Sequence, residues 1–149
     1  YMDQITSFMD EQLANSKRHE DDKLLTKTMI NNYTKNDLLP PPVKKKYSKI
    51  HMAYLLVICT LKPTLDMATI QKIMPIGISE EEAVCIYNSF VLNQRKAHQY
   101  VTEKVRAVAD PILALEENGP DRRNDLLMQM AAAANICKIL TEATTKIEE

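Results

Sequence analysis

Apolar side chains recur at spacings of three and four residues through much of the second half of this chain. The pattern begins after Ser79, which has Glu82 three residues further on, as in a helix capping box. Spacings of three and four place side chains along one side of an α-helix. The sequence therefore predicts one long helix with a heptad-like seam. The seam positions are Val84, Tyr87, Val91, Gln94, His98, Val101, Val105, Val108, Ile112 and Leu115.

A second long helix is expected after a turn at Asn118, Gly119 and Pro120, running from Asp121 to about Lys146. Small side chains at 131–134 allow another helix to approach closely. Its other apolar positions are Leu126, Leu127, Met130, Cys137, Leu140 and Ile147.

The two long helices pair either as a hairpin within one chain or as a coiled coil between chains, and the sequence leaves both open. We expect a homodimer, because one head with one hairpin would leave part of the seam bare. Gln94 and His98 would then be polar markers of the register. For His98, a hydrogen-bonded structural role is favoured over a pH switch.

Shorter helices are predicted in the first half. Residues 3–14 place apolar side chains on one face, and residues 15–23 form a polar loop. Thr26, Ser48 and Asp66 each precede a further helical pattern as an N-cap. The expected inward positions are Ile5, Phe8, Met9, Leu13, Met29, Ile30, Tyr33, Ile50, Tyr54, Val57, Ile58, Leu61, Ile70, Ile73 and Met74.

Composition agrees with an all-α fold. The chain has 149 residues, 45% of them hydrophobic, with two Gly, no Trp and 5% aromatic residues, which disfavours a turn-rich sheet. Pro75 and Gly77 end the first half, so we expect a head at 1–76 and a helical dimerisation or effector region at 77–149. We also expect the natural protein to have residues upstream of Tyr1.

Positive charge is concentrated in one part of the chain. Residues 23–51 contain seven Lys and one acid, Asp37, a net charge of +6 against −1 for the whole chain. Such a patch attracts polyanions, and phosphate contacts supply most non-specific nucleic-acid affinity. A solvated lysine face is the plain alternative.

Three prolines, Pro40–Pro42, stop the helix before this patch ends. Their fixed backbone predicts an extended segment that continues through Val43 to Tyr47, as a loop or small wing with outward lysines.

Several function classes are disfavoured. Cys59, Cys85 and Cys137 form no CxxC pair and lack histidines at ligand spacing, so they are interpreted as core residues of a reducing cytoplasm, without a disulfide framework or zinc site. No nucleotide-binding, nucleophile-elbow or metalloprotease motif occurs. No apolar run is long enough to span a bilayer. We therefore expect no catalysis, no metal, no cofactor and no membrane partner. His51 is interpreted as a surface or helix-start residue.

Residues 26–42, TKTMINNYTKNDLLPPP, resemble the recognition helix and turn of MerR-type regulators. Asn32 and Tyr33 occupy the paired-aromatic places, Leu38 to Pro40 match the Leu-Leu-Pro ending, and Lys45 to Tyr47 resemble the wing Arg-x-Tyr. The chain departs from that pattern at Asn31, Thr34 and Asp37, where the family has Arg, Glu and Gly.

A second resemblance is to an uncharacterised bacterial family, YkrK-like, a domain of unknown function. It rests on YMDQ, LTKTMINNYTKN, LLPPP and KKYS, which begin at Tyr1, Leu25, Leu38 and Lys45. The resemblances imply a bacterial regulator with a helix-turn-helix-like head.

The residues themselves predict a sequence-specific, double-stranded-DNA-binding transcriptional regulator. Helix 26–36 would enter the major groove, with amides reading adenine and lysines holding phosphates. The competing interpretation is a helical adaptor that binds a partner helix and does not bind DNA. The operator and any small-molecule effector are not predicted. The expected DNA-binding residues are Lys27, Thr28, Asn31, Asn32, Tyr33, Lys35, Lys44, Lys45, Lys46, Tyr47 and Lys49.

Overall fold

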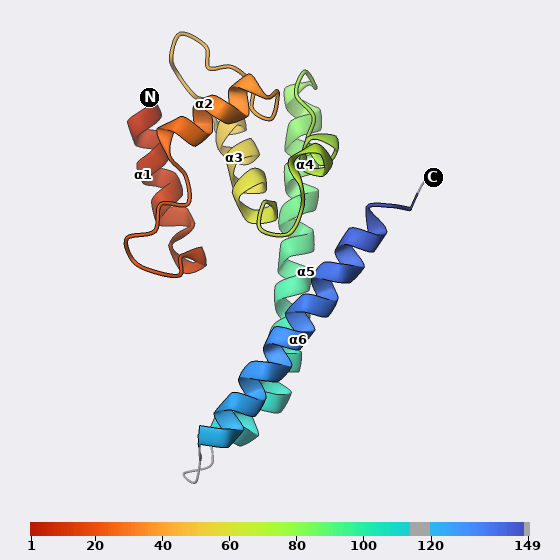
Figure 1. Ribbon diagram of the computed structural model, residues 1–149. Helices are drawn as coiled ribbons and strands as arrows, with labels where there is room; N and C mark the ends of the chain where they lie inside the picture. Colours follow the sequence, from red (N-terminus) through yellow and green to blue (C-terminus); the bar gives the residue numbers. More distant parts are fainter. Residues whose placement is uncertain (114–119, 148–149) are drawn as a thin grey trace. The chain divides into compact units, whose positions relative to one another are not determined.

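The computed structural model describes residues 1–113 and 120–147, and within them all regular structure is helical (Figure 1). The all-α prediction is confirmed. The elements are α1 (Met2–Gln12), the short 3-10 helix η1 (Ala14–Ser16), α2 (Lys27–Lys35), α3 (Lys49–Leu61), α4 (Met67–Ile73), α5 (Glu80–Leu113) and α6 (Pro120–Thr144).

The chain forms two compact units, Tyr1–Phe90 and Val91–Glu149. In the first unit α1 packs against α2 and α3, and α3 packs against α4. The start of α5 also belongs to this unit, because Ala83 is buried and Tyr87 and Phe90 pack against the core. The unit therefore extends past Gly77 and includes the start of α5 up to Phe90.

Helix starts in the first unit follow the sequence closely. Thr26 Oγ1 accepts the Met29 N–H at 3.2 Å, and Asp66 Oδ1 accepts the Thr69 N–H at 2.7 Å. Ser79 and Glu82 form the reciprocal capping box, with donor–acceptor distances of 2.8 and 3.1 Å. These bonds satisfy N–H groups that a helix leaves without an internal partner. The predicted caps Thr26, Asp66 and Ser79 are confirmed, and Ser48 is the N-cap of α3 as predicted.

The core of the first unit is built around α3, which is buried on most sides. Tyr54, Leu55, Val57 and Ile58 are at most 2% exposed. The Tyr54 hydroxyl donates to the Pro75 carbonyl at 2.7 Å, so its one polar atom is satisfied. This bond ties the end of α4 to α3.

Two expected core residues lie at the edge of the core. Phe8 is 37% exposed and Ile73 is 39% exposed, so their prediction as inward residues was wrong. In each helix a pair spaced four residues apart fills the inward position, Ile5 with Met9 and Ile70 with Met74. Phe8 and Ile73 are therefore rotated toward solvent.

The second unit contains the rest of α5 and α6. Ala109 is buried and Leu126 and Met130 are half-buried, but Gln94 and His98 are exposed and Val101 is 52% exposed. Leu115, Asn118 and Gly119 lie outside the described residues. The predicted helices are confirmed, while much of the predicted seam is exposed to solvent in the single chain.

The three cysteines are free thiols, and only Cys59 is partly buried. Burial raises the pKa of the Cys59 thiol to about 11, with Lys62 partly offsetting the rise. Cys85 and Cys137 are exposed, so their interpretation as core residues was wrong. Both lie on outward sides of long helices. Among the described residues, no helix combines the length and apolar character that crossing a membrane requires.

Candidate nucleic-acid interface

Helix α2 has two distinct faces. Ile30 and Tyr33 are 0% and 4% exposed and point into the core. The opposite face carries side chains at the helical spacings i, i+3, i+4 and i+7, which form one line along the helix. That line is exposed and consists of Thr28, Asn31, Asn32 and Lys35. Both amides predicted to face outward do so.

Tyr33 fixes α2 to the rest of the unit and is not itself available to a ligand. Its hydroxyl accepts a hydrogen bond from Lys62 Nζ at 3.3 Å, and that ammonium lies 5.7 Å from the ring centroid. Burial raises the pKa of the Tyr33 phenol, and the bond from Lys62 partly offsets the rise. The predicted DNA-binding role of Tyr33 is thus limited to positioning α2.

The end of α2 is held as firmly as its middle. The N–H groups of Leu38 and Leu39 both donate to the Tyr33 carbonyl, at 2.9 and 3.2 Å. Gln71 Nε2 of α4 donates to the Asp37 carbonyl at 3.1 Å. Asp37 itself has a positive φ of 55° at the place where the helix ends. The exposed side chains of α2 therefore project from a helix whose end is fixed by hydrogen bonds.

The predicted wing is a two-residue β-turn made of lysines. Val43 and Lys46 exchange both backbone hydrogen bonds, at 3.1 and 2.9 Å, and form an isolated antiparallel bridge. Lys44 and Lys45 between them have φ of 48° and 62°. Positive φ at both central positions is the type I′ turn, which normally holds Asn and Gly. Lysine carries a conformational cost there, on the order of 1 kcal/mol per residue.

All lysine side chains of this turn segment are exposed, as are those of Lys35 and Lys49. Among the described residues, none of these five lysines has a carboxylate within ion-pairing distance. In Figure 1 the loop between α2 and α3, which carries the turn, lies at the same end of the first unit as α2. We call Thr28, Asn31, Asn32, Lys35, Lys44, Lys45, Lys46 and Lys49 the lysine–amide surface.

His51 anchors the base of the turn. The Ser48 N–H donates to His51 Nδ1 at 3.0 Å, so Nδ1 is unprotonated, and Nε2–H donates to the Pro41 carbonyl at 3.3 Å. The edge of Tyr47 contacts the ring, with centroids 5.3 Å apart and planes at 82°. His51 is 6% exposed and lies in the first turn of α3, so the helix-start alternative is confirmed and the surface alternative was wrong. It joins the proline segment to the start of α3, and Tyr47 supports it.

Lys27 differs from the other predicted phosphate ligands because it forms an ion pair with Asp3 of α1. Both side chains are exposed, and such pairs exchange easily with solvent and ions. A phosphate would have to compete with Asp3 for this ammonium. Lys27 is therefore a weaker candidate than Lys35.

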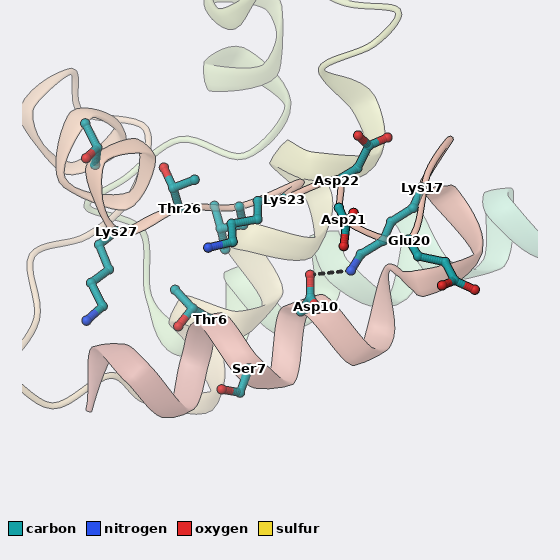
Figure 2. Close-up of a pocket in the computed structure, with 12 residues that line it drawn as sticks. Thr6, Ser7, Asp10, Lys17, Glu20, Asp21, Asp22, Lys23, Thr26 and Lys27 are labelled. Atoms are coloured by element: carbon teal, nitrogen blue, oxygen red, sulfur yellow. Dashed lines mark ion pairs between the residues drawn. The ribbon is translucent and has the colours of Figure 1, made fainter.

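A polar cleft of about 600 Å³ lies between α1 and the loop that precedes α2 (Figure 2). Lys17 Nζ pairs with Asp10 at 2.7 Å, and Asp22 Oδ2 accepts the backbone N–H groups of Arg18 and His19 at 3.1 and 3.0 Å. Lys17, Asp10 and Asp22 therefore serve to fold the loop. Among the described residues no group of His, Cys, Asp and Glu side chains suits a metal ion. The sequence analysis missed this cleft, although the acidic run 20–22 beside lysines was its visible signal.

An apolar groove of about 260 Å³ lies in the first unit between α1, α3 and the start of α5. Phe8, Leu56, Val84 and Tyr87 line it, with Lys49 at its rim. The groove explains why Phe8 and Val84 are partly exposed. Its apolar positions come from three helices, so periodicity within one helix did not reveal it.

Comparison with known proteins identifies the first unit as a family domain. Residues 1–90 match the family model described as "Domain of unknown function (DUF1836)". No curated protein and no solved structure matched the chain. The matched residues coincide with the compact unit Tyr1–Phe90 and include the whole lysine–amide surface.

Proposed function

Because the chain belongs to the DUF1836 family, whose description assigns no activity, we propose its function from the surface of the domain itself: it binds duplex DNA through the lysine–amide surface. In this proposal it is a cytoplasmic transcriptional regulator with a helix-turn-helix-like head that resembles the MerR type. Catalysis plays no part in it.

The size and chemistry of α2 support a place in the major groove. An α-helix with its side chains is about 10–12 Å across, and the major groove is about 12 Å wide, so the exposed face of the nine-residue α2 can enter it. Asn31 and Asn32 project from the exposed face, and an asparagine amide can donate to adenine N7 and accept from adenine N6. Lys35 on the same line would meet a flanking phosphate.

The observation that carries the proposal is the lysine turn. Two adjacent lysines hold positive φ where glycine or asparagine would cost less. Unfavourable backbone conformations persist where surrounding structure enforces them, and they gather at functional sites. A tight turn that projects neighbouring ammonium groups toward solvent is suited to the closely spaced phosphates of a duplex.

The test is duplex binding by fluorescence anisotropy over a range of salt concentrations. We expect Lys44→Gln/Lys45→Gln/Lys46→Gln to weaken binding at least ~10-fold at low salt, and to lower the slope of log affinity against log salt by about 2 to 3. Asn31→Ala/Asn32→Ala should reduce the preference among sequences while leaving that slope unchanged.

The matched control is Lys96→Gln/Lys104→Gln/Lys138→Gln, which removes the same charge from exposed positions outside the first unit. It should bind as the unchanged chain does. The proposal fails if the unchanged chain does not bind duplexes at low salt, a result that would favour a helical adaptor. It also fails if both triple variants lose affinity equally.

A further inference from the structure

Helix α6 carries two apolar stripes. The first contains the seam expected from the sequence; its members Leu126 and Met130 are half-buried, whereas Leu127, Cys137 and Leu140 are exposed. The second has spacings of four, four, three and four residues, and every member is exposed. The second stripe is Met128, Ala132, Ile136, Ile139 and Ala143.

The two stripes lie on different sides of the helix. At about 100° per residue, the centre of the second stripe is rotated by about 130° from that of the first. One side of the helix between the stripes is polar and carries Asn124, Asn135, Lys138 and Glu142, while Asp125 and Gln129 lie along the second stripe. A helix that packs against one neighbour needs one apolar stripe, and a second apolar stripe calls for a second covering surface.

The exposed stripe is too apolar for a surface in water. Met128, Ile136 and Ile139 are 61%, 57% and 55% exposed, and Leu140, which lies beside them on the helix, is 61% exposed. Scattered single apolar residues are ordinary on a surface, but contiguous patches of this kind mark interaction sites.

We propose that a second copy of this chain covers the second stripe of α6, so that helices from two chains form one bundle. The proposal does not depend on DNA binding. Helix α6 contains three acids, Asp121, Asp125 and Glu142, and three bases, Arg122, Arg123 and Lys138, so its net charge is zero and two copies do not repel each other.

The available area is adequate for a stable dimer. A helix of 25 residues is about 37 Å long and about 10 Å across, so one face of α6 offers on the order of 400 Å². A stable complex needs about 800 Å² from each partner. Helix α5 exposes Leu92, Tyr100 and Val101 by 52%, 64% and 52%, which supplies further apolar area within the same unit. The part of α5 in this unit adds on the order of 300 Å² by the same reckoning, so a bundle of two α5–α6 pairs comes close to the required size.

The experiment is mass determination by light scattering after size exclusion, with the unchanged full chain at tens of micromolar. We expect twice the mass of one chain. Ile136→Glu/Ile139→Glu would place two carboxylates in the proposed contact and should raise the dissociation constant at least ~100-fold, because an unpaired buried charge costs several kcal/mol. Both positions are exposed in the single chain, so its helices should be retained by circular dichroism.

The matched control is Asn124→Glu/Asn135→Glu, which adds two carboxylates on the polar strip of the same helix and should remain a dimer. A mass of one chain for the unchanged protein overturns the proposal. So does a dimer whose stability is unaffected by Ile136→Glu/Ile139→Glu, since the contact would then lie elsewhere. The readout needs no DNA, so its failure is separate from failure of the proposed function.

Discussion

At the scale of single residues, Lys44 and Lys45 combine an unfavourable backbone conformation with a useful positive charge. Positive φ places the two side chains at the tip of a two-residue turn, and the paired Val43 and Lys46 enforce that geometry. Asparagine and glycine adopt the same conformation at lower cost but carry no charge. The lysines therefore destabilise the turn slightly while providing its positive charge.

Replacing these residues by the favourable turn sequence should separate stability from binding. We expect Lys44→Asn/Lys45→Gly to stabilise the first unit by about 1 kcal/mol, which corresponds to a rise in melting temperature of roughly 4–8 °C for a domain of this size. Duplex affinity at low salt should fall, because two phosphate contacts are lost. Thermal denaturation and anisotropy measure the two effects.

Lys44→Arg/Lys45→Arg is the control, because it keeps both the charge and the strained backbone. It should leave the melting temperature and the duplex affinity close to those of the unchanged chain. A lower melting temperature for the Asn-Gly variant would show that the turn geometry had been misassigned.

At the scale of elements, the starts of α4 and α5 depend on ionised side chains. The N–H of Thr69 lowers the pKa of the Asp66 carboxyl, and the N–H of Ser79 lowers the pKa of the Glu82 carboxyl. A carboxyl with a lowered pKa in the folded state stabilises the fold above its unfolded pKa of about 4. That contribution is lost as the pH falls through the folded value.

Replacing these two capping carboxyls by their neutral amides should therefore change how the stability of the fold depends on pH in the acid range. We expect Asp66→Asn/Glu82→Gln to lower the melting temperature at pH 7. Between pH 5 and pH 3, the melting temperature of this variant should fall less steeply than that of the unchanged chain. Thermal denaturation across that pH range tests this. Glu11→Gln/Asp21→Asn, which changes two exposed carboxylates away from helix caps, should keep the original slope. Parallel profiles for the cap variant and the unchanged chain would contradict the assignment.

At the scale of the whole molecule, the two units differ in how completely they bury their apolar side chains. The first unit has a continuous core that includes Met9, Ile30, Leu39 and Tyr54, all at most 2% exposed. In the second unit the apolar stripe of α6 remains exposed. The first unit has the core that independent folding requires, whereas the exposed stripe of the second is the surface that we propose a second copy covers.

A fragment containing residues 1–90 should therefore fold alone. We expect a cooperative thermal transition by circular dichroism and the mass of one chain by light scattering, because the fragment keeps the core and lacks α6. A non-cooperative transition would show that the core depends on the remainder of the chain. A fragment that dimerised as tightly as the full chain would instead place the main contact between copies within the first unit.

The sequence by itself determined the helices, their caps and the outward direction of Asn31 and Asn32, because these features depend on interactions within about four residues. Tertiary structure alone decided contacts between distant residues, such as Lys62 with Tyr33 and Gln71 with Asp37, 29 and 34 positions apart. It also paired Lys27 with Asp3, buried His51 beneath the proline segment and left Cys85 and Cys137 exposed. Packing decides such features because the neighbours of a side chain come from several helices, whose mutual approach no single periodicity encodes.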